Sequence, residues 1–280
     1  MYTPQPYALL PDIQSRIDPR GLALDEVGVK GLRHPVTIQT RGGPQPTVAV
    51  LSMTVGLPAS AKGTHMSRFV EVLAAHTGVL DQAGFQALVR GMLGRLHADS
   101  GAIDMAFPCF IRKTAPVSGE QSLLDYDAVW HGEIRHDGAY HFRARVTVPV
   151  TSLCPCSKEI SDYGAHNQRS LISIEAELSQ DMALEDLVAI AERNASCEVY
   201  GLLKRPDEKY VTERAYDNPK FVEDLVRDVA LALEGEPRVR AWRVEAENFE
   251  SIHNHSAFAR VSSRVPAGTS PAANAVKSRV

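Results

Sequence analysis

The sequence predicts an α+β fold made of two tandem ββααββ units with antiparallel sheets. Alternating apolar residues mark strands, and apolar residues at three-to-four spacing mark helices between them. The same order of elements recurs after the tight-turn signal His136-Asp137-Gly138. We therefore place a first unit at residues 31–137 and a second unit at residues 138–265.

The first unit opens with a predicted hairpin, because the turn-forming Gly42-Gly43-Pro44 separates two alternating stretches. The second helical stretch places Phe85, Leu88 and Met92 on one face. In chain order, the predicted elements are strands at 34–42 and 45–56, helices at 66–76 and 81–97, and strands at 101–113 and 124–135.

The second unit repeats this order. Its second helix has Asn218 in the position of an N-cap and Pro219 at the first turn, which is a strong start signal. In chain order, the predicted elements are strands at 139–152 and 169–178, helices at 183–196 and 219–234, and strands at 238–248 and 255–264. Residues 1–30 are predicted to be an N-terminal extension, and residues 266–280 a flexible tail.

Composition narrows the function classes. The 280 residues are 44% hydrophobic and carry a formal net charge of −4 with both signs interspersed, so no basic block is available for a nucleic-acid backbone. The sequence shows neither a basic, apolar leader nor a run of about eighteen apolar residues. We therefore expect a cytoplasmic protein that binds neither nucleic acid nor membrane. Its four cysteines are too few for a disulfide scaffold, which favours metal binding or nucleophilic chemistry.

The densest reactive cluster lies between two predicted strands of the second unit. It contains Ser152-Leu153-Cys154-Pro155-Cys156-Ser157-Lys158, followed by Gly164-Ala165-His166-Asn167-Gln168-Arg169. A connection of this length is more typical of a functional loop than of a turn. Cys154 leaves one strand and His166 enters the next, so a thiolate and an imidazole could share one metal ion.

Glu208 and His253 are two further candidate ligands that could converge on that ion. A set of Cys, His, Glu and His suits zinc or iron and also admits manganese, and its obvious use is activation of a bound water. Simpler interpretations remain open at this point. A cysteine is often a small buried hydrophobe, and His253 and His255, two apart on a predicted strand, could serve only packing.

Three segments together resemble a known family, type IB GTP cyclohydrolase I. They are the cluster described above, the segment Lys62-Gly63-Thr64-His65-Met66-Ser67-Arg68-Phe69, and the segment Asn248-Phe249-Glu250-Ser251-Ile252-His253-Asn254-His255. The resemblance covers most of residues 25–265. It implies a tunnelling fold, in which ββααββ units join through their strands into barrels, and a homotetramer with active sites at subunit interfaces.

The resemblance also implies an activity, which is hydrolysis of cyclic amidine C–N bonds. GTP would be converted to 7,8-dihydroneopterin triphosphate and formate, the first step of folate biosynthesis. One divalent ion per site (Zn, Mn or Fe) would be held by Cys154, His166, Glu208 and His253. Supporting catalytic groups would be Cys156, Glu250 and His255, and either His255 or His166 would be the proton donor.

Glu223 corresponds to the carboxylate that anchors the base in this family. A carboxylate can accept two parallel hydrogen bonds from the ring N–H and the exocyclic amine of guanine. Without the resemblance, a solvated glutamate favoured by the helix dipole is the simpler interpretation of this residue.

Two alternatives compete with this function. One is a nitrile reductase of the same fold, in which Cys154 would attack the substrate and NADPH would supply hydride. The other is a non-catalytic oligomer in which Cys154, Cys156, His166 and His253 form a closed structural zinc site without a water ligand.

Overall fold

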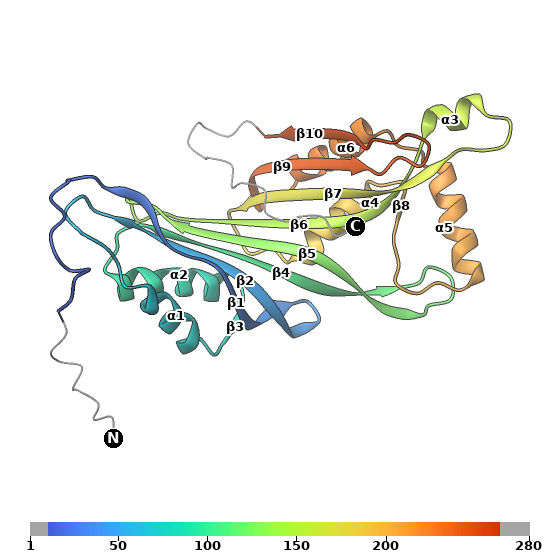
Figure 1. The fold of residues 1–280 in the computed structure, drawn as a ribbon. Coiled ribbons are helices and arrows are strands. Elements are labelled where there is room, and N and C mark those ends of the chain that lie inside the picture. Colours follow the sequence, from blue (N-terminus) through green and yellow to red (C-terminus); the bar gives the residue numbers. More distant parts are fainter. Residues whose placement is uncertain (1–10, 264–280) are drawn as a thin grey trace, which may run out of the picture.

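The computed structural model describes residues 11–263, and the predicted C-terminal tail lies outside this range. The chain forms one ten-stranded sheet with helices packed beside it (Figure 1). The strands are β1 (Leu24–Thr40), β2 (Gly43–Leu57), β3 (Val79–Leu80), β4 (Gly101–Thr114), β5 (Gln121–Ile134), β6 (Tyr140–Leu153), β7 (Asn167–Leu178), β8 (Cys197–Glu198), β9 (Val239–Asn248) and β10 (Ala257–Ser262). The helices are α1 (Met66–Ala75), α2 (Gln82–Leu96), α3 (Pro155–Ile160), α4 (Leu184–Arg193), α5 (Arg205–Asp217) and α6 (Val222–Glu234).

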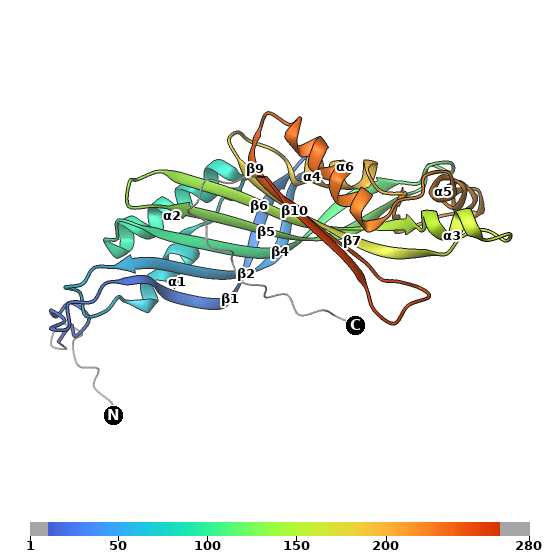
Figure 2. The same cartoon turned by 90° about the horizontal axis from the view of Figure 1, so that it is seen from above.

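The sheet runs without a break through both halves of the chain. Its strand order is β10-β9-β7-β6-β5-β4-β2-β1-β3, with β8 paired to β6. The halves meet where β5 and β6 pair antiparallel, with Trp130 opposite Ala144. In Figure 2, α1 and α2 accompany the first half of the sheet and α4 and α6 the second, while α3 and α5 lie together at one end.

The core lies between the sheet and the helices. Phe85 of α2 makes edge-to-face contacts with Trp130 and Phe142, with ring centroids 5.6 and 6.0 Å apart. One continuous cluster of buried apolar side chains extends from β1 to β9. The opposite face of the central strands is polar, as the cross-strand pair of His131 and Asp104 illustrates. This alternation of apolar and polar faces is what the sequence pattern predicts for an antiparallel sheet.

The predicted α+β class is confirmed, and so is the ββααββ order of the first half, to which the structure adds only the short strand β3. One difference lies in β1, which begins at Leu24 rather than at residue 34. Its early part contains Gly28 and Gly31 and has register shifts at Leu24/Val27 and Val29/Leu32. Such bulges interrupt the alternation on which the sequence-based prediction depends.

The second half contains two helices that the sequence pattern does not predict. The helix α3 is only six residues long and occupies the loop between β6 and β7. The helix α5 is polar almost all round, with only Asp207 and Ala215 buried, so it lacks an apolar stripe. The predicted start of the last helix is wrong as well: Asn218 ends α5, and α6 begins at Val222 after the N-cap Phe221.

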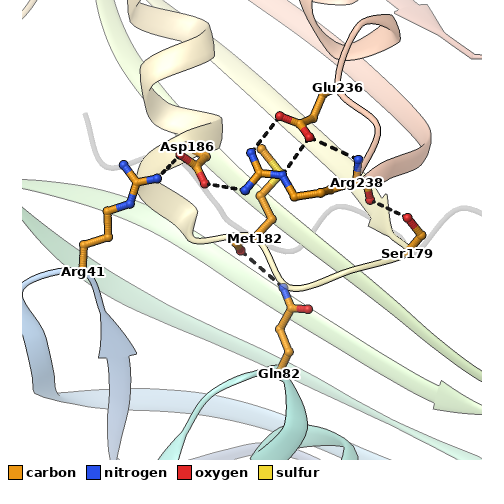
Figure 3. A network of polar contacts seen from close by, with 7 residues as sticks. All are labelled: Arg41, Gln82, Ser179, Met182, Asp186, Glu236 and Arg238. Atoms are coloured by element: carbon orange, nitrogen blue, oxygen red, sulfur yellow. Dashed lines mark hydrogen bonds and ion pairs between the residues drawn. The ribbon is translucent and has the colours of Figure 1, made fainter.

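A polar network joins the two halves on the helix side of the sheet (Figure 3). Arg41, in the β1–β2 turn, donates to Asp186 of α4. Asp186 also accepts from Arg238 at 3.1 Å, and the guanidinium of Arg238 lowers the pKa of Glu236 to about 2 through hydrogen bonds. Gln82 of α2 donates to the Met182 carbonyl at 3.3 Å. The β1–β2 turn and the start of α2 are thus tied to the segment that leads into α4.

A buried ion pair provides a second link. Lys113 of β4 lies 2.6 Å from Glu192 of α4, with side-chain exposures of 12% and 11%. Glu192 also accepts from the Tyr126 hydroxyl at 2.9 Å. Removing one member of a buried pair leaves the other charge uncompensated, which is far more harmful than replacing both.

We therefore expect Lys113→Met to lower the free energy of unfolding by about 3 kcal/mol. Urea denaturation at fixed protein concentration measures this loss. The double variant K113M/E192M should recover most of it. A loss of less than about 1 kcal/mol in the single variant, a value typical of exposed pairs, would contradict a stabilising role for this contact.

Candidate active site

Cys154 and His166 lie at the adjacent ends of β6 and β7. The two strands pair up to Leu153 opposite Asn167, and the next residues continue the contact: the Cys154 backbone N–H donates to the His166 carbonyl at 3.1 Å. Both side chains are half-buried. The backbones of the two residues predicted to share an ion therefore lie side by side.

Cys154 also begins the helix α3. Its sulfur accepts from the Ser157 backbone N–H at 3.4 Å, and Pro155 occupies the first turn. Ser157 in turn accepts from the His166 backbone N–H at 3.2 Å, which closes the loop on itself. Cys156, two residues further on, is exposed. Helix α3 therefore fixes the position of the Cys154 side chain.

The loop between β9 and β10 lies against His166. The Ser251 hydroxyl is 3.4 Å from Nδ1 of His166. The rings of His253 and His255 stack on each other with centroids 5.3 Å apart, and both are exposed. The prediction that β10 begins at residue 255 is wrong, because pairing with β9 starts at Ala257. Both histidines therefore lie in an exposed loop that leaves their rings available to ligands.

Glu223 lies at the start of α6, and Glu250 lies in the β9–β10 loop. Glu223 is exposed in the first turn of α6, as predicted. The chain just before α6 is attached to the end of β6, since the Lys220 backbone N–H donates to the Leu153 carbonyl at 3.0 Å. Glu250, half-buried, follows the end of β9. The segment that leads into α6 is thus held at Leu153, the residue before Cys154.

Glu208 is not gathered with the other candidate ligands. It lies on an exposed face of α5 beside Arg205, Lys209 and Thr212. Within residues 11–263 of one chain, no group of three or more His, Cys, Asp or Glu side chains is close enough to hold an ion. Within one chain the structure therefore joins Cys154 and His166 through their backbones and places the β9–β10 loop beside His166, but it gathers neither the His253 ring nor Glu208 with them into an ion-holding group.

The position of α5 is set by Asp207, which the sequence analysis missed. This carboxylate is fully buried and accepts from the Val117 and Ser118 backbone N–H groups at 2.8 Å, from the Ser118 hydroxyl at 2.6 Å and from the Lys204 backbone N–H at 2.8 Å. Burial opposes its ionisation, yet these hydrogen bonds hold the pKa of Asp207 below its usual range. The helix that carries Glu208 is thereby fixed to the β4–β5 turn.

The other two cysteines are poor candidates for chemistry. Burial raises the pKa of Cys109 to about 12 and that of Cys197 to about 11, with smaller contributions from Glu185 and Glu198 respectively. A thiol with such a pKa is almost entirely protonated near neutral pH and is a weak nucleophile and ligand. Sulfur chemistry in this chain therefore points to Cys154 and Cys156.

Fold and site together define an α+β protein with a thiol and an imidazole at adjacent strand ends. A sequence profile of the family described as "Type I GTP cyclohydrolase folE2" matches residues 10–259, and the chain belongs to this family. The family is thus FolE2 by name rather than type IB, and the predicted resemblance is confirmed at the level of type I GTP cyclohydrolase.

Curated relatives agree with this assignment. The chain is 62% identical over 253 residues to "GTP cyclohydrolase FolE2 1" of Dechloromonas aromatica, a match that covers 90% of this chain and 95% of that protein. It is 58% identical over 255 residues to "GTP cyclohydrolase FolE2" of Paraburkholderia xenovorans, covering 91% and 95%.

Similar solved structures include two urate oxidases. Uricase from Arthrobacter globiformis has a TM-score of 0.49 at 8% identity, covering 89% of this chain and 96% of that one. A mutant of Bacillus sp. TB-90 urate oxidase has a TM-score of 0.48 at 10% identity, covering 86% and 99%. Similarity at this level supports no functional conclusion.

Proposed function

We propose that this protein is a GTP cyclohydrolase I that converts GTP and water to 7,8-dihydroneopterin triphosphate and formate, the first step of tetrahydrofolate biosynthesis. The observation that carries the proposal is the juxtaposition of Cys154, His166 and the His253 loop in a chain of the FolE2 family. Membership in this family favours GTP hydrolysis over the nitrile reductase and the structural zinc site.

The proposed metal site consists of Cys154, His166, Glu208 and His253. Thiolate, imidazole and carboxylate donors fit a divalent ion such as zinc, manganese or iron. Two features of the site support this fit. The Nδ1 atom of His166 lies within hydrogen-bonding distance of Gln168 and Ser251. The ring of His253 is exposed and stacked on that of His255. Such an ion, when bound, supplies activation of a water molecule near neutral pH. The set would be completed through subunit assembly, because within residues 11–263 one chain does not bring three of these groups together.

The remaining residues act on the substrate. Glu223 accepts the ring N–H and the exocyclic amine of guanine, which aligns C8 of the purine for attack by water. Exposed His255 donates the proton as the imidazole ring of the purine opens. Cys156 and Glu250 support these groups. A second water releases C8 as formate. The ribose, still bonded to one of the two nitrogens, then rearranges to a ketone, and the freed amine condenses with this ketone with loss of one water.

The proposed assembly is a cytoplasmic homotetramer with active sites between subunits. Exposed apolar side chains flank the candidate site, with exposures of 78% for Ile160, 101% for Tyr163 and 64% for Ile252. In addition, among residues 11–263 β10 ends the sheet, and a strand at a sheet edge can pair with another copy of the chain. Under this proposal, the units 31–137 and 138–265 join through their strands into barrels. Across residues 11–263, helices with the length and apolar character needed to cross a membrane are absent.

Direct turnover tests the proposal. Purified protein stripped of metal and then supplied with GTP and Zn²⁺, Mn²⁺ or Fe²⁺ should release formate and a fluorescent pterin after oxidation, in equal amounts. An NADPH-oxidation assay with a nitrile substrate is the matched control and should show no reaction. If GTP persists with every ion while the protein stays folded and metal-loaded, the structural zinc interpretation holds and the proposed activity is wrong.

A further inference from the structure

A polar side chain occupies a core position of β7 immediately behind the candidate site. The buried face of β7 carries Ile172, Ile174 and Ala176, yet at the same alternation the strand begins with Gln168 and Ser170. Gln168 is only 7% exposed. Burying an amide costs free energy unless its hydrogen bonds are satisfied, so its presence here requires an explanation.

The contacts of Gln168 lead directly to His166. Its Oε1 lies 3.0 Å from Nδ1 of His166, and its Nε2 donates to the Ser152 hydroxyl at 3.1 Å. Ser152 is in turn 2.6 Å from the Ser170 hydroxyl, and both serines are fully buried. The contact with Ser152, which Ser170 contacts in turn, thus orients the amide of Gln168.

This arrangement determines which tautomer of a neutral His166 is favoured. With its amide nitrogen directed at Ser152, Gln168 presents an oxygen, which can only accept, to the imidazole. In the neutral imidazole Nδ1 therefore carries the proton, and Nε2 keeps its lone pair. A ligand histidine whose second nitrogen is held by a carbonyl has its tautomer and ring orientation fixed in this way.

We propose that Gln168 is a positioning residue for His166: it fixes the neutral tautomer that binds a divalent ion through Nε2. The inference rests on the proposed function, because it takes His166 as a ligand. It also gives a role to the buried serines Ser152 and Ser170, which orient the amide rather than contact the site.

Ser251 provides an internal comparison. Its hydroxyl also faces Nδ1 of His166, but at 3.4 Å and from an exposed loop. A longer contact from a solvated loop constrains the ring less than a 3.0 Å contact from a buried amide. Ser251→Ala is therefore a matched control that removes a neighbour of the same nitrogen.

The test measures the affinity of the full-length protein for Zn²⁺ and for Mn²⁺, with a chelator competing against the protein for each ion. Gln168→Met keeps the side-chain length without hydrogen bonds and should weaken affinity by about 10–100-fold. Ser251→Ala should change it by less than about threefold, and Gln168→Glu, which restores an acceptor, should recover affinity relative to Gln168→Met. At saturating metal, KM for GTP should be unchanged in Gln168→Met.

Wild-type affinity in folded Gln168→Met would overturn the inference. If that variant does not fold, Ser152→Ala decides, because it frees the amide from its anchor; unchanged affinity there would equally overturn it. His166→Ala separates the positioning role of Gln168 from the proposed role of His166 as a ligand. If His166→Ala loses metal while Gln168→Met does not, only the positioning role is wrong, whereas metal binding unaffected by His166→Ala would remove the proposed ligand itself.

Discussion

Replacing Cys154 with serine should abolish turnover of GTP while leaving a folded protein. A serine hydroxyl does not ionise near neutral pH and cannot take the place of a thiolate ligand. Activation of water by a metal is worth several kcal/mol, so we expect kcat to fall on the order of 10³-fold or more. Bound metal, measured by elemental analysis, should fall with it.

The choice of serine separates ligation from folding. The sulfur of Cys154 accepts from the Ser157 N–H at the start of α3, and serine is a better N-cap than cysteine. Circular dichroism and the oligomeric state should therefore match the wild type. Cys156→Ser is the neighbouring control and should retain its metal, since Cys156 is exposed and is not assigned as a ligand. Full activity of Cys154→Ser would refute the proposed site.

Much of the fold could be predicted from the sequence because most strands have one apolar face. Alternation located β4 to β7 and β9 closely, since each packs one side on the core and turns the other to polar surroundings. The same reasoning failed for α5, whose residues are polar on nearly all sides. Its position depends on Asp207 and a turn almost ninety residues earlier in the chain, a contact that no local pattern reveals.

The residues of the candidate site likewise differ in whether the sequence could predict them. Cys154 and His166 could be paired from sequence because they flank one connection between neighbouring strands. Gln168 was missed, although a signal existed: in β7 it occupies a position where the alternation calls for an apolar residue. Polar residues at buried strand positions next to reactive loops are therefore worth seeking in a sequence. Whether Glu208 joins the other candidate ligands could not be predicted, because no pattern in the sequence indicates how distant segments such as α5 and the β6–β7 loop are placed in space.

Glu223→Gln should produce the second large effect, a fall in kcat/KM for GTP on the order of 10²-fold. The carboxylate is exposed in the first turn of α6, and this helix starts beside the end of β6 because Lys220 donates to Leu153. Each hydrogen bond to a charged group contributes about 1.5–3 kcal/mol. In Glu223→Gln the amide NH₂ would face one of the two guanine donors, so that one of the two hydrogen bonds would be lost.

Substrate selectivity makes this prediction specific. ITP lacks the exocyclic amine of GTP, so the wild-type protein should prefer GTP and Glu223→Gln should lose most of that preference, while its metal content stays unchanged. Glu234→Gln, at the exposed C-terminal end of the same helix, is the matched control and should leave both substrates unaffected. Unaltered discrimination between GTP and ITP in Glu223→Gln would mean that another group recognises the base, because a carboxylate that grips both guanine donors cannot lose its charge without losing selectivity.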